Sequence, residues 1–362
     1  MAETRAGEFA PNYASPPGDT ITEILDVRGM SQAELALRIG MAAKTVNEIV
    51  KGKAPITPET AIKLEHVLGV PASFWNTREQ QYREKLACQA DGDRLAGQVS
   101  WLTEIPVREL INREAIPDSK DKAALVQNAL KFFGVASEDQ WKRVWKIVPV
   151  SYRKSKKFES HLGSLAAWLR LGELQAQAIE CERYDEKKFR VNLGIVRSLT
   201  TEPPAVFEPE LKKLCAKSGV ALVLVSELQK THVSGGTRWM NPYKAIVQLS
   251  LRYKSDDQFW FTFFHEAGHV ILHSSKEIFL EGIDHKSDKE TEADDFAANF
   301  LIPSAEYKTF TARGYFSKVA IRSFAQSIGI APGIAVGRLQ YDGFLPMSHC
   351  NELKRRFTLV GG

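Results

Sequence analysis

One short run of residues, HEAGH at 265–269, has the residue types and the spacing that bind a catalytic metal. On a helix, positions i and i+4 lie on one face, so the imidazoles of His265 and His269 can bind one ion with Glu266 beside them. The apolar letters on both sides, WFTFF before the run and VIL after it, indicate a buried helix. The sequence therefore predicts a Zn²⁺ site on a buried helix.

A catalytic zinc ion needs a third protein ligand and an open position for water, and Glu290 is the predicted third ligand. It follows His269 after residues 270–289 and begins the segment ETEADDFAANFLIP. As a helix, this segment has one face made of Glu290, alanines and a leucine, so the carboxylate can point inward and the two helices can approach closely. Asp294, one turn further along, is predicted to accept a hydrogen bond from a liganding imidazole.

Two neighbouring residues are weaker candidates. Glu292 is the rival third ligand, but its helical face carries Phe296 instead of small residues. His273 continues the row from His269, but an imidazole one turn on lies about 6 Å further along the axis, so we interpret it as structural. Five other side chains could act as acid or oxyanion groups, and none is assigned a catalytic role: His232, Arg238, Tyr243, His285 and His349. The alternative for the whole region is a buried helix with hydrogen-bonded histidines and a solvated second helix.

A second pattern, near the N-terminus, has the layout of a DNA-recognition helix. Ser31 and Glu34 form an S-x-x-E capping box that opens a helix, and Gly40 supplies the turn after it. In the next helix, about 42–50, two apolar residues face inward and polar residues point elsewhere. In a helix-turn-helix, such residues meet base edges and phosphates in the major groove. The predicted DNA-contacting residues are Ala43, Lys44, Thr45, Asn47, Lys51 and Lys53, of which Lys44, Thr45 and Asn47 are the base readers.

The alternative for this N-terminal pattern is a helical bundle that packs against another surface. Residues 19–80 hold seven Lys/Arg and eight Asp/Glu, and this balance favours the bundle over a DNA-binding face.

The composition bounds the class of protein. At 362 residues, with 44% hydrophobic and 25% charged residues, the chain is an ordinary globular protein of two or three domains rather than a disordered or fibrous one. The net charge of +4 is too small for a polybasic coat, so any DNA contact must be local. Four cysteines without a C-x-x-C pair fit free thiols in a reducing cytosol. The longest apolar runs are far shorter than the roughly 20 residues of a membrane helix, so we expect a soluble, cytoplasmic protein without membrane contact.

The periodicity of apolar residues and the positions of prolines indicate how the chain is divided into domains. We divide it into four segments: a flexible leader at 1–18, a domain of five short helices at 19–88, a helical middle domain at 89–204 and an α+β domain at 205–362. The last segment is predicted to contain strands at 221–225 and 244–250, the second lying beside the metal-binding helix with an open edge for an extended peptide. Further helices are predicted at 106–115, 121–133, 158–182, 207–219, 256–273, 290–301, 316–328 and 331–340. The predicted fold class is mainly α with a small α+β C-terminal domain.

Three stretches of the N-terminal segment, PPGDTITEIL, MSQAELALRIG and VNEIVKGKAPITPETAIKLEHVLGVPASFW, together resemble the HigA-type antitoxin branch of the XRE helix-turn-helix family. The resemblance implies binding to double-stranded operator DNA as a homodimer. Two recognition helices would then lie about one DNA turn apart on a palindrome.

The segment HEAGHVILH, followed by ETEADDFAANFLIP, resembles the ImmA/IrrE family of metallo-endopeptidases over roughly residues 205–345. The stretch SFAQSIGIAPGIAVGRLQYDGFL resembles the C-terminal part of the HigA-linked branch. The resemblance implies a zincin-like metallopeptidase domain in which His265, His269 and Glu290 bind zinc and Glu266 is the general base. These four positions match the family pattern, which identifies no transition-state helper here.

These features predict a DNA-binding transcriptional regulator that carries a zinc-dependent endopeptidase. The resemblance implies cleavage of a regulatory protein, either a repressor or antitoxin-like partner or the chain itself, in a stress or toxin–antitoxin switch. The alternative is a HigA-like antitoxin or repressor with a non-catalytic zinc site. Glu266 favours the enzyme, because a purely structural site needs no general base beside an open coordination position.

Overall fold

The computed structural model describes residues 14–145, 162–250, 255–273, 278–280 and 288–357. Most of the predicted leader, residues 1–13, lies outside these ranges, and so does His285. The chain forms two compact units, Met1–Gln98 and Val99–Gly362. Residues 99–204 of the predicted middle domain therefore share a unit with the predicted C-terminal domain. The domain boundaries at 88 and 204 stay predictions.

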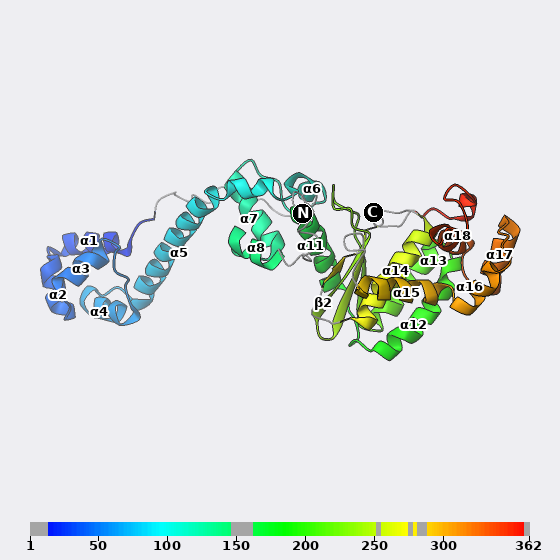
Figure 1. Cartoon of the computed structure of the whole chain (residues 1–362). Helices are drawn as coiled ribbons and strands as arrows, with labels where there is room; N and C mark the ends of the chain where they lie inside the picture. Colours follow the sequence, from blue (N-terminus) through cyan, green and yellow to red (C-terminus); the bar gives the residue numbers. More distant parts are fainter. Residues whose placement is uncertain (1–13, 146–161, 251–254, 274–277, 281–287, 358–362) are drawn as a thin grey trace. The chain divides into compact units, whose positions relative to one another are not determined.

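Over residues 14–98, the N-terminal unit is a bundle of five helices, shown in blue to cyan in Figure 1. The helices are α1 (Pro17–Arg28), α2 (Gln32–Ile39), α3 (Ala43–Val50), α4 (Pro58–Leu68) and α5 (Ala72–Ala96). Ser31 caps α2 by accepting a hydrogen bond from the backbone N–H of Glu34 at 3.1 Å. Gly40 ends α2 with a φ of 64°, a left-handed conformation that glycine adopts without steric cost. The predicted capping residue and turn are thus confirmed.

The two inward residues of α3 fix the orientation of that helix. Val46 and Ile49 are 2% and 4% exposed and belong to the same hydrophobic cluster as Leu35 of α2 and Trp75 of α5. Burying such side chains stabilises the fold by about 1.5–3 kcal/mol each. The opposite face of α3 must therefore point to solvent.

The C-terminal unit is mainly helical around a small sheet. Before the sheet come η1 (Val99–Thr103), α6 (Val107–Asn112), α7 (Lys122–Phe133), α8 (Glu138–Trp145), α11 (Leu162–Ala178), α12 (Glu186–Ser198), η2 (Leu199–Thr201) and α13 (Pro204–Ala216). From the sheet onward come α14 (Asp256–Leu272), α15 (Asp288–Leu301), α16 (Ser304–Thr311), α17 (Lys318–Ser327), α18 (Pro332–Tyr341) and η3 (Asn351–Leu353). The mainly α class with a small α+β part is confirmed, while α8, α12 and α16 were not predicted.

The described residues of this unit form a four-stranded sheet of order β1-β3-β2-β4. The strands are β1 (Val220–Leu224), β2 (Gly235–Asn241), β3 (Lys244–Leu249) and β4 (Phe279–Leu280). β1 runs parallel to β3, whereas β2 is antiparallel to both β3 and β4. The two predicted strands are present as β1 and β3. The predicted open edge of 244–250 is wrong, because β3 is hydrogen-bonded on both sides and the edges are β1 and β4.

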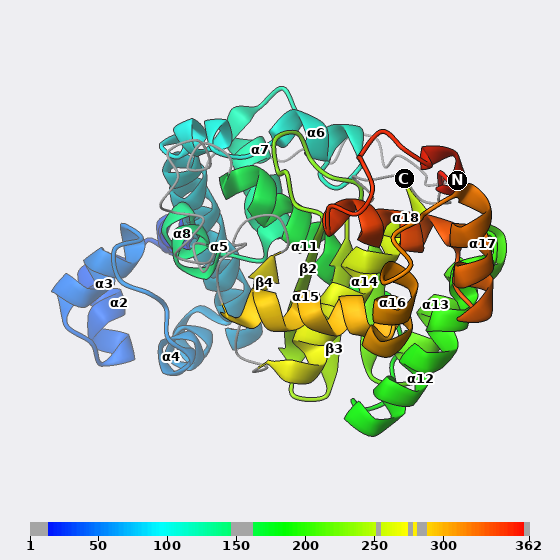
Figure 2. The same cartoon turned by 45° about the vertical axis from the view of Figure 1, so that its right-hand side comes forward.

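Helices cover both faces of the sheet, so the sheet is the middle of three layers. Side chains alternate along a strand, and Gln248 of β3 donates to the Trp168 carbonyl of α11 at 2.7 Å on one face. On the other face, the neighbouring Val247 joins the hydrophobic cluster that contains α14. Figure 2 shows α14 lying between the sheet and α15. All five residues of β1 are buried, as expected for a strand covered on both sides.

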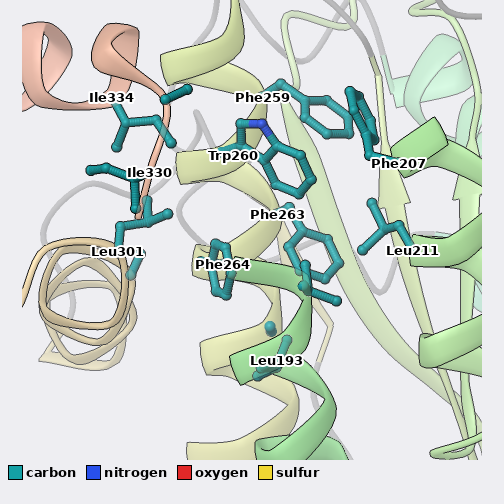
Figure 3. Close-up of a cluster of buried hydrophobic side chains, with 14 of the residues drawn as sticks. Leu193, Phe207, Leu211, Phe259, Trp260, Phe263, Phe264, Leu301, Ile330 and Ile334 are labelled. Carbon is teal, nitrogen blue, oxygen red and sulfur yellow. The ribbon is translucent and has the colours of Figure 1, made fainter. Parts of the chain in front are cut away.

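Aromatic packing anchors the first half of α14 in the hydrophobic core of the C-terminal unit (Figure 3). Phe259, Trp260, Phe263 and Phe264 follow one another along the helix, and each is at most 6% exposed. The rings of Trp260 and Phe207 of α13 lie 4.8 Å apart, centre to centre. Tilted aromatic pairs at this distance add about 0.5–1.5 kcal/mol beyond the area that they bury. The helix that carries HEAGH is therefore anchored in the hydrophobic core.

The first turn of α14 is held by the C-terminal segment. Asp256 is 0% exposed and lies 3.5 Å from the Arg355 guanidinium, and Asp257 lies 2.6 Å from the Lys354 ammonium. Burial, together with the charge of Asp257, raises the pKa of Asp256 to about 6, although Arg355 opposes the shift. Two carboxylates at a helix N-terminus also complement the helix dipole.

Among the described residues, no single helix is long and apolar enough to cross a membrane. The pair α17 and α18 passes that test only when taken together, by length and composition, and the pair is bent by 113°.

Candidate functional site

The HEAGH motif lies in α14, as predicted, and its two histidines are buried one turn apart. His265 is 2% exposed and His269 1% exposed, and their Nε2 atoms lie 3.0 Å from each other. Gly268 faces α15: a Cβ at this position would lie 3.3 Å from the Cα of Ala293 and 3.1 Å from the ring of Phe296. The small residues let the two helices approach closely, which brings the carboxylates of α15 to the imidazoles.

Glu290 of α15 completes the group. Its Oε2 lies 3.1 Å from His265 Nε2, and its Oε1 lies 3.3 Å from His269 Nε2. Zinc bonds of about 2.0–2.2 Å at tetrahedral angles separate two ligand atoms by about 3.3–3.6 Å. The observed separations of 3.0–3.3 Å are within a few tenths of an ångström of that range. Two imidazoles and one carboxylate are also the donor set that zinc prefers, so these residues fit the ion.

The pKa shifts of His269 and Glu290 also suit a cation. Burial lowers the pKa of His269, and its hydrogen bond with Glu290 offsets this only in part, so the imidazole is neutral. Burial alone raises the pKa of Glu290, but hydrogen bonds with His265 and His269 outweigh burial and lower it to about 2. A metal ligand must be a neutral imidazole or an ionised carboxylate. His269 and Glu290 meet that requirement at neutral pH.

Asp294 lies where an outer partner of a ligand is expected. Its Oδ1 is 2.8 Å from Nδ1 of His265. An ionised carboxylate only accepts, so Nδ1 of His265 donates its proton to Asp294, and with a metal bound Nε2 would give its lone pair to the ion. The carboxylate thereby orients the imidazole for ligation.

Glu292 lies away from the three converging side chains. Its carboxylate side chain is 60% exposed and its Oε2 contacts Nε2 of His273 at 3.1 Å. Among the described residues, ligand atoms of His265, His269 and Glu290 all lie within 4.8 Å of one another. Between the two carboxylates that the sequence leaves open, the geometry thus favours Glu290.

Glu266 is fully buried between α14 and β2. Its Oε2 accepts a hydrogen bond from the Thr237 hydroxyl at 2.6 Å. Gly235 gives the carboxylate room, because a Cβ there would lie 2.6 Å from Glu266 Oε1. Neither Thr237 nor Gly235 was identified in the sequence, since β2 (GGTRWMN) lacks the apolar alternation of a recognisable strand.

The other acid or oxyanion candidates lie in varied surroundings. Arg238 is paired with Glu173 at 3.3 Å, and Tyr243 is 52% exposed beneath the Arg183 guanidinium. His349 is exposed, with Nδ1 3.2 Å from the Ser348 hydroxyl. His232 is exposed on the loop before β2. None of these observations assigns a role in chemistry.

The predicted DNA-contacting residues lie along the outer face and the exit of α3. Ala43, Lys44, Lys51 and Lys53 are exposed, whereas Thr45 and Asn47 are half-buried. Ala42 gives α3 no side-chain cap, in contrast to the hydroxyl caps of α2 and α4. The first-turn amides of α3 therefore receive no acceptor from the side chain of Ala42.

Models of known protein families match two separate parts of the chain. The helix-turn-helix family matches residues 21–75, and the IrrE N-terminal-like domain family matches residues 221–332. The chain therefore carries an XRE-type helix-turn-helix domain near its N-terminus and an IrrE/ImmA-like peptidase-family domain toward its C-terminus. The second match includes all of the HEAGH motif and Glu290.

Relatives were found for the N-terminal part. The chain is 42% identical over 59 residues to the uncharacterised HTH-type transcriptional regulator YddM of Escherichia coli (strain K12). That match covers 16% of this chain and 63% of the relative. Solved structures include the Pseudomonas aeruginosa antitoxin HigA with the higBA promoter, at 30% identity and a TM-score of 0.22 over 23% of this chain and 90% of that chain. Antitoxin GraA matches at 28% identity and a TM-score of 0.22, over 23% and 91%.

Proposed function

We propose that the protein is a DNA-binding transcriptional regulator carrying a zinc-dependent endopeptidase that cleaves a regulatory protein. The substrate class is a repressor or antitoxin-like partner, or the chain itself, and cleavage is the event that switches transcription. The observation that carries the proposal is the convergence of His265, His269 and Glu290 inside the IrrE-like domain of a chain that also has a helix-turn-helix domain.

The chemistry divides between the ion and the chain. A zinc ion held by His265, His269 and Glu290 would supply Lewis acidity toward a water molecule and a peptide carbonyl. Glu266 takes a proton from the attacking water and returns it to the departing amine nitrogen. The Thr237 hydroxyl holds one oxygen of Glu266, which restricts the rotation of the carboxylate. The buried surroundings strengthen these electrostatic interactions, because they exclude bulk water.

The N-terminal unit binds the DNA in this proposal. Lys44, Thr45 and Asn47 read base edges, and Lys51 and Lys53 contact phosphates together with the start of α3. The regulator acts as a homodimer on a palindromic operator, because one helix-turn-helix reads one half-site. A protein that binds operator DNA works in the compartment that holds the DNA, which we take to be the cytoplasm.

A HigA-like antitoxin or repressor with a non-catalytic zinc site is the competing function. Structural zinc sites are closed by four protein ligands, whereas catalytic sites use three and keep one position open. Three donors converge in the part of the chain that the structure describes, which supports the enzyme. The carboxylate of Glu266 next to the ligands supports it as well.

Cleavage of the proteins encoded beside the gene tests the proposal. The zinc-loaded full chain is incubated with each of these proteins, and the products are read on a gel and by mass spectrometry. One neighbour is expected to be cut at a single site, and the cut should disappear with a chelator and return with zinc. If wild type cuts none of these partners and does not cut itself, the competing function replaces the proposal.

A further inference from the structure

His273 lies at the C-terminal end of α14, and the proposed chemistry does not use it. Its side chain is only 3% exposed, although it follows the last residue of the helix. Its Nδ1 lies 2.9 Å from Nδ1 of His269, and its Nε2 lies 3.1 Å from Oε2 of Glu292. The imidazole therefore bridges a metal-ligating histidine and a carboxylate at the surface.

The direction of each hydrogen bond follows from the way His269 binds. Nε2 of His269 faces His265 and Glu290, where the proposed zinc ion would sit, so with zinc bound Nε2 gives its lone pair to the ion and the proton of the ring is on Nδ1. That proton can only be donated to His273, whose Nδ1 must then be the acceptor. The proton of His273 consequently lies on Nε2 and is donated to the Glu292 carboxylate. Every donor in this chain of hydrogen bonds meets an acceptor.

Ring packing holds the two imidazoles in this arrangement. The ring of Phe279 in β4 stacks on His269 with centroids 4.2 Å apart and planes 13° apart. The same ring lies 5.1 Å from His273 at 36°. One aromatic side chain thus restricts the tilt of both imidazoles, and the short strand β4 gains a role beyond the sheet.

We propose that His273 and Glu292 form a relay of two hydrogen bonds that orients His269 and strengthens zinc binding. The inference rests on the proposed metal site. With the relay, a carboxylate orients each of the two liganding histidines: Asp294 orients His265 directly, and Glu292 orients His269 through His273. His273 is thus a positioning residue, and Glu292 contributes to the site without binding the ion.

Zinc affinity of the full-length protein tests the relay. The apo protein is titrated with zinc against a chromophoric chelator, and melting curves of each variant report the fold. His273→Phe keeps an aromatic ring beside Phe279 but removes both hydrogen bonds. We expect zinc affinity to fall about 10–100-fold, the usual cost of losing an outer partner of a ligand. His273→Gln is expected to recover part of that loss, because its amide can accept from His269 and donate to Glu292.

Two exposed carboxylates of α15 provide a matched pair of variants that do not threaten the fold. Glu292→Ala is expected to weaken zinc binding several-fold, since His273 loses its acceptor. Asp295→Asn, three residues further along, removes a similar charge outside the relay and is expected to leave affinity unchanged. If Asp295→Asn weakens zinc binding as much as Glu292→Ala does, the loss of negative charge near the site would explain both results, and the relay would be overturned.

The outcomes separate the relay from the metal site itself. Wild-type affinity in a folded His273→Phe protein overturns the relay alone and leaves the three ligands in place. No zinc binding by wild type overturns both proposals. A loss in His273→Phe that His273→Gln fails to recover at all also contradicts the relay, because shape rather than hydrogen bonding would then explain the loss.

Discussion

The proposed recognition helix α3 and the proposed metal-binding helix α14 differ in where their polar side chains point. In α3, the inward face is apolar and the proposed DNA-contacting residues lie on or near the surface. In α14, the polar residues of the motif are themselves buried, among aromatic side chains and against α15 and β2. A surface helix can present its chemistry alone, whereas a buried polar group needs partners from other elements to offset the loss of water. The two sites should therefore respond differently to mutation.

The largest expected effect is the loss of peptide cleavage in a variant that still binds zinc and DNA. Glu266→Gln keeps the shape of the side chain but removes the base, so cleavage of the partner protein is expected to fall by about 10²–10⁴-fold. Zinc content, measured by mass spectrometry of the metal, and operator affinity are expected to stay at wild-type values. Cleavage at an undiminished rate would remove Glu266 from the mechanism.

The metal ligands provide the next effect. His269→Ala and Glu290→Gln each remove one of three ligands, so zinc affinity is expected to fall by more than the roughly 100-fold cost of losing an outer partner. Glu292→Gln is the matched control on α15 and is expected to stay within about tenfold of wild type. Loss of zinc in Glu292→Gln with retention in Glu290→Gln would reverse the choice of ligand.

Substitutions on the proposed DNA-binding face should weaken DNA binding without changing the metal site. Lys44→Ala combined with Asn47→Ala is expected to weaken binding to a palindrome near the promoter by at least about 30-fold, since each base contact contributes about 1–3 kcal/mol. Lys63→Ala on the exposed face of α4 carries a similar charge change and is the control. Fluorescence anisotropy with labelled DNA measures both, and an unchanged double variant would contradict the assignment of α3.

A smaller effect is expected from the residue that holds the base. Thr237→Val preserves the shape of the side chain but removes its hydrogen bond to Glu266, so kcat is expected to fall by about tenfold at constant KM. Thr237→Ser restores a hydroxyl and is expected to regain most of the rate. If both variants lose the same activity, packing rather than the hydrogen bond is responsible.

The smallest effect concerns pH and the buried first turn of α14. The pKa of Asp256 is raised to about 6 from an ordinary value of 3.8, so the stability linked to its protonated form is present below about pH 4 and is lost as pH rises through 6. Asp256→Asn stays neutral, so its melting temperature relative to wild type should rise between pH 4 and 7, by the equivalent of about 1–2 kcal/mol. Asp295→Asn, at an exposed site, should show no such trend, and a flat difference for Asp256→Asn would contradict the raised pKa.

Much of the helical framework could be predicted, because it depends on local periodicity. α2, α3, α7, α14 and α15 fall close to the ranges expected from apolar spacing and caps, and β1 and β3 are recognisable apolar runs. The strands that were missed lack such a signal. β2 contains two glycines and an arginine, and β4 has only two residues, so both exist because a neighbouring strand offers hydrogen-bond partners. The open edge expected for residues 244–250 failed for the same reason, since β2 pairs there.

The sequence by itself determined the spacing of His265, Glu266 and His269, because i and i+4 geometry is a property of any helix. It also determined which face of α3 is buried, through Val46 and Ile49. Only the tertiary structure favours Glu290 over Glu292 as the proposed third ligand, since that preference depends on the rotation of α15 about its own axis against Gly268. It likewise placed Thr237 on Glu266 and His273 between His269 and Glu292. These are contacts between elements, and their geometry is set by packing across the core rather than by spacing along the chain.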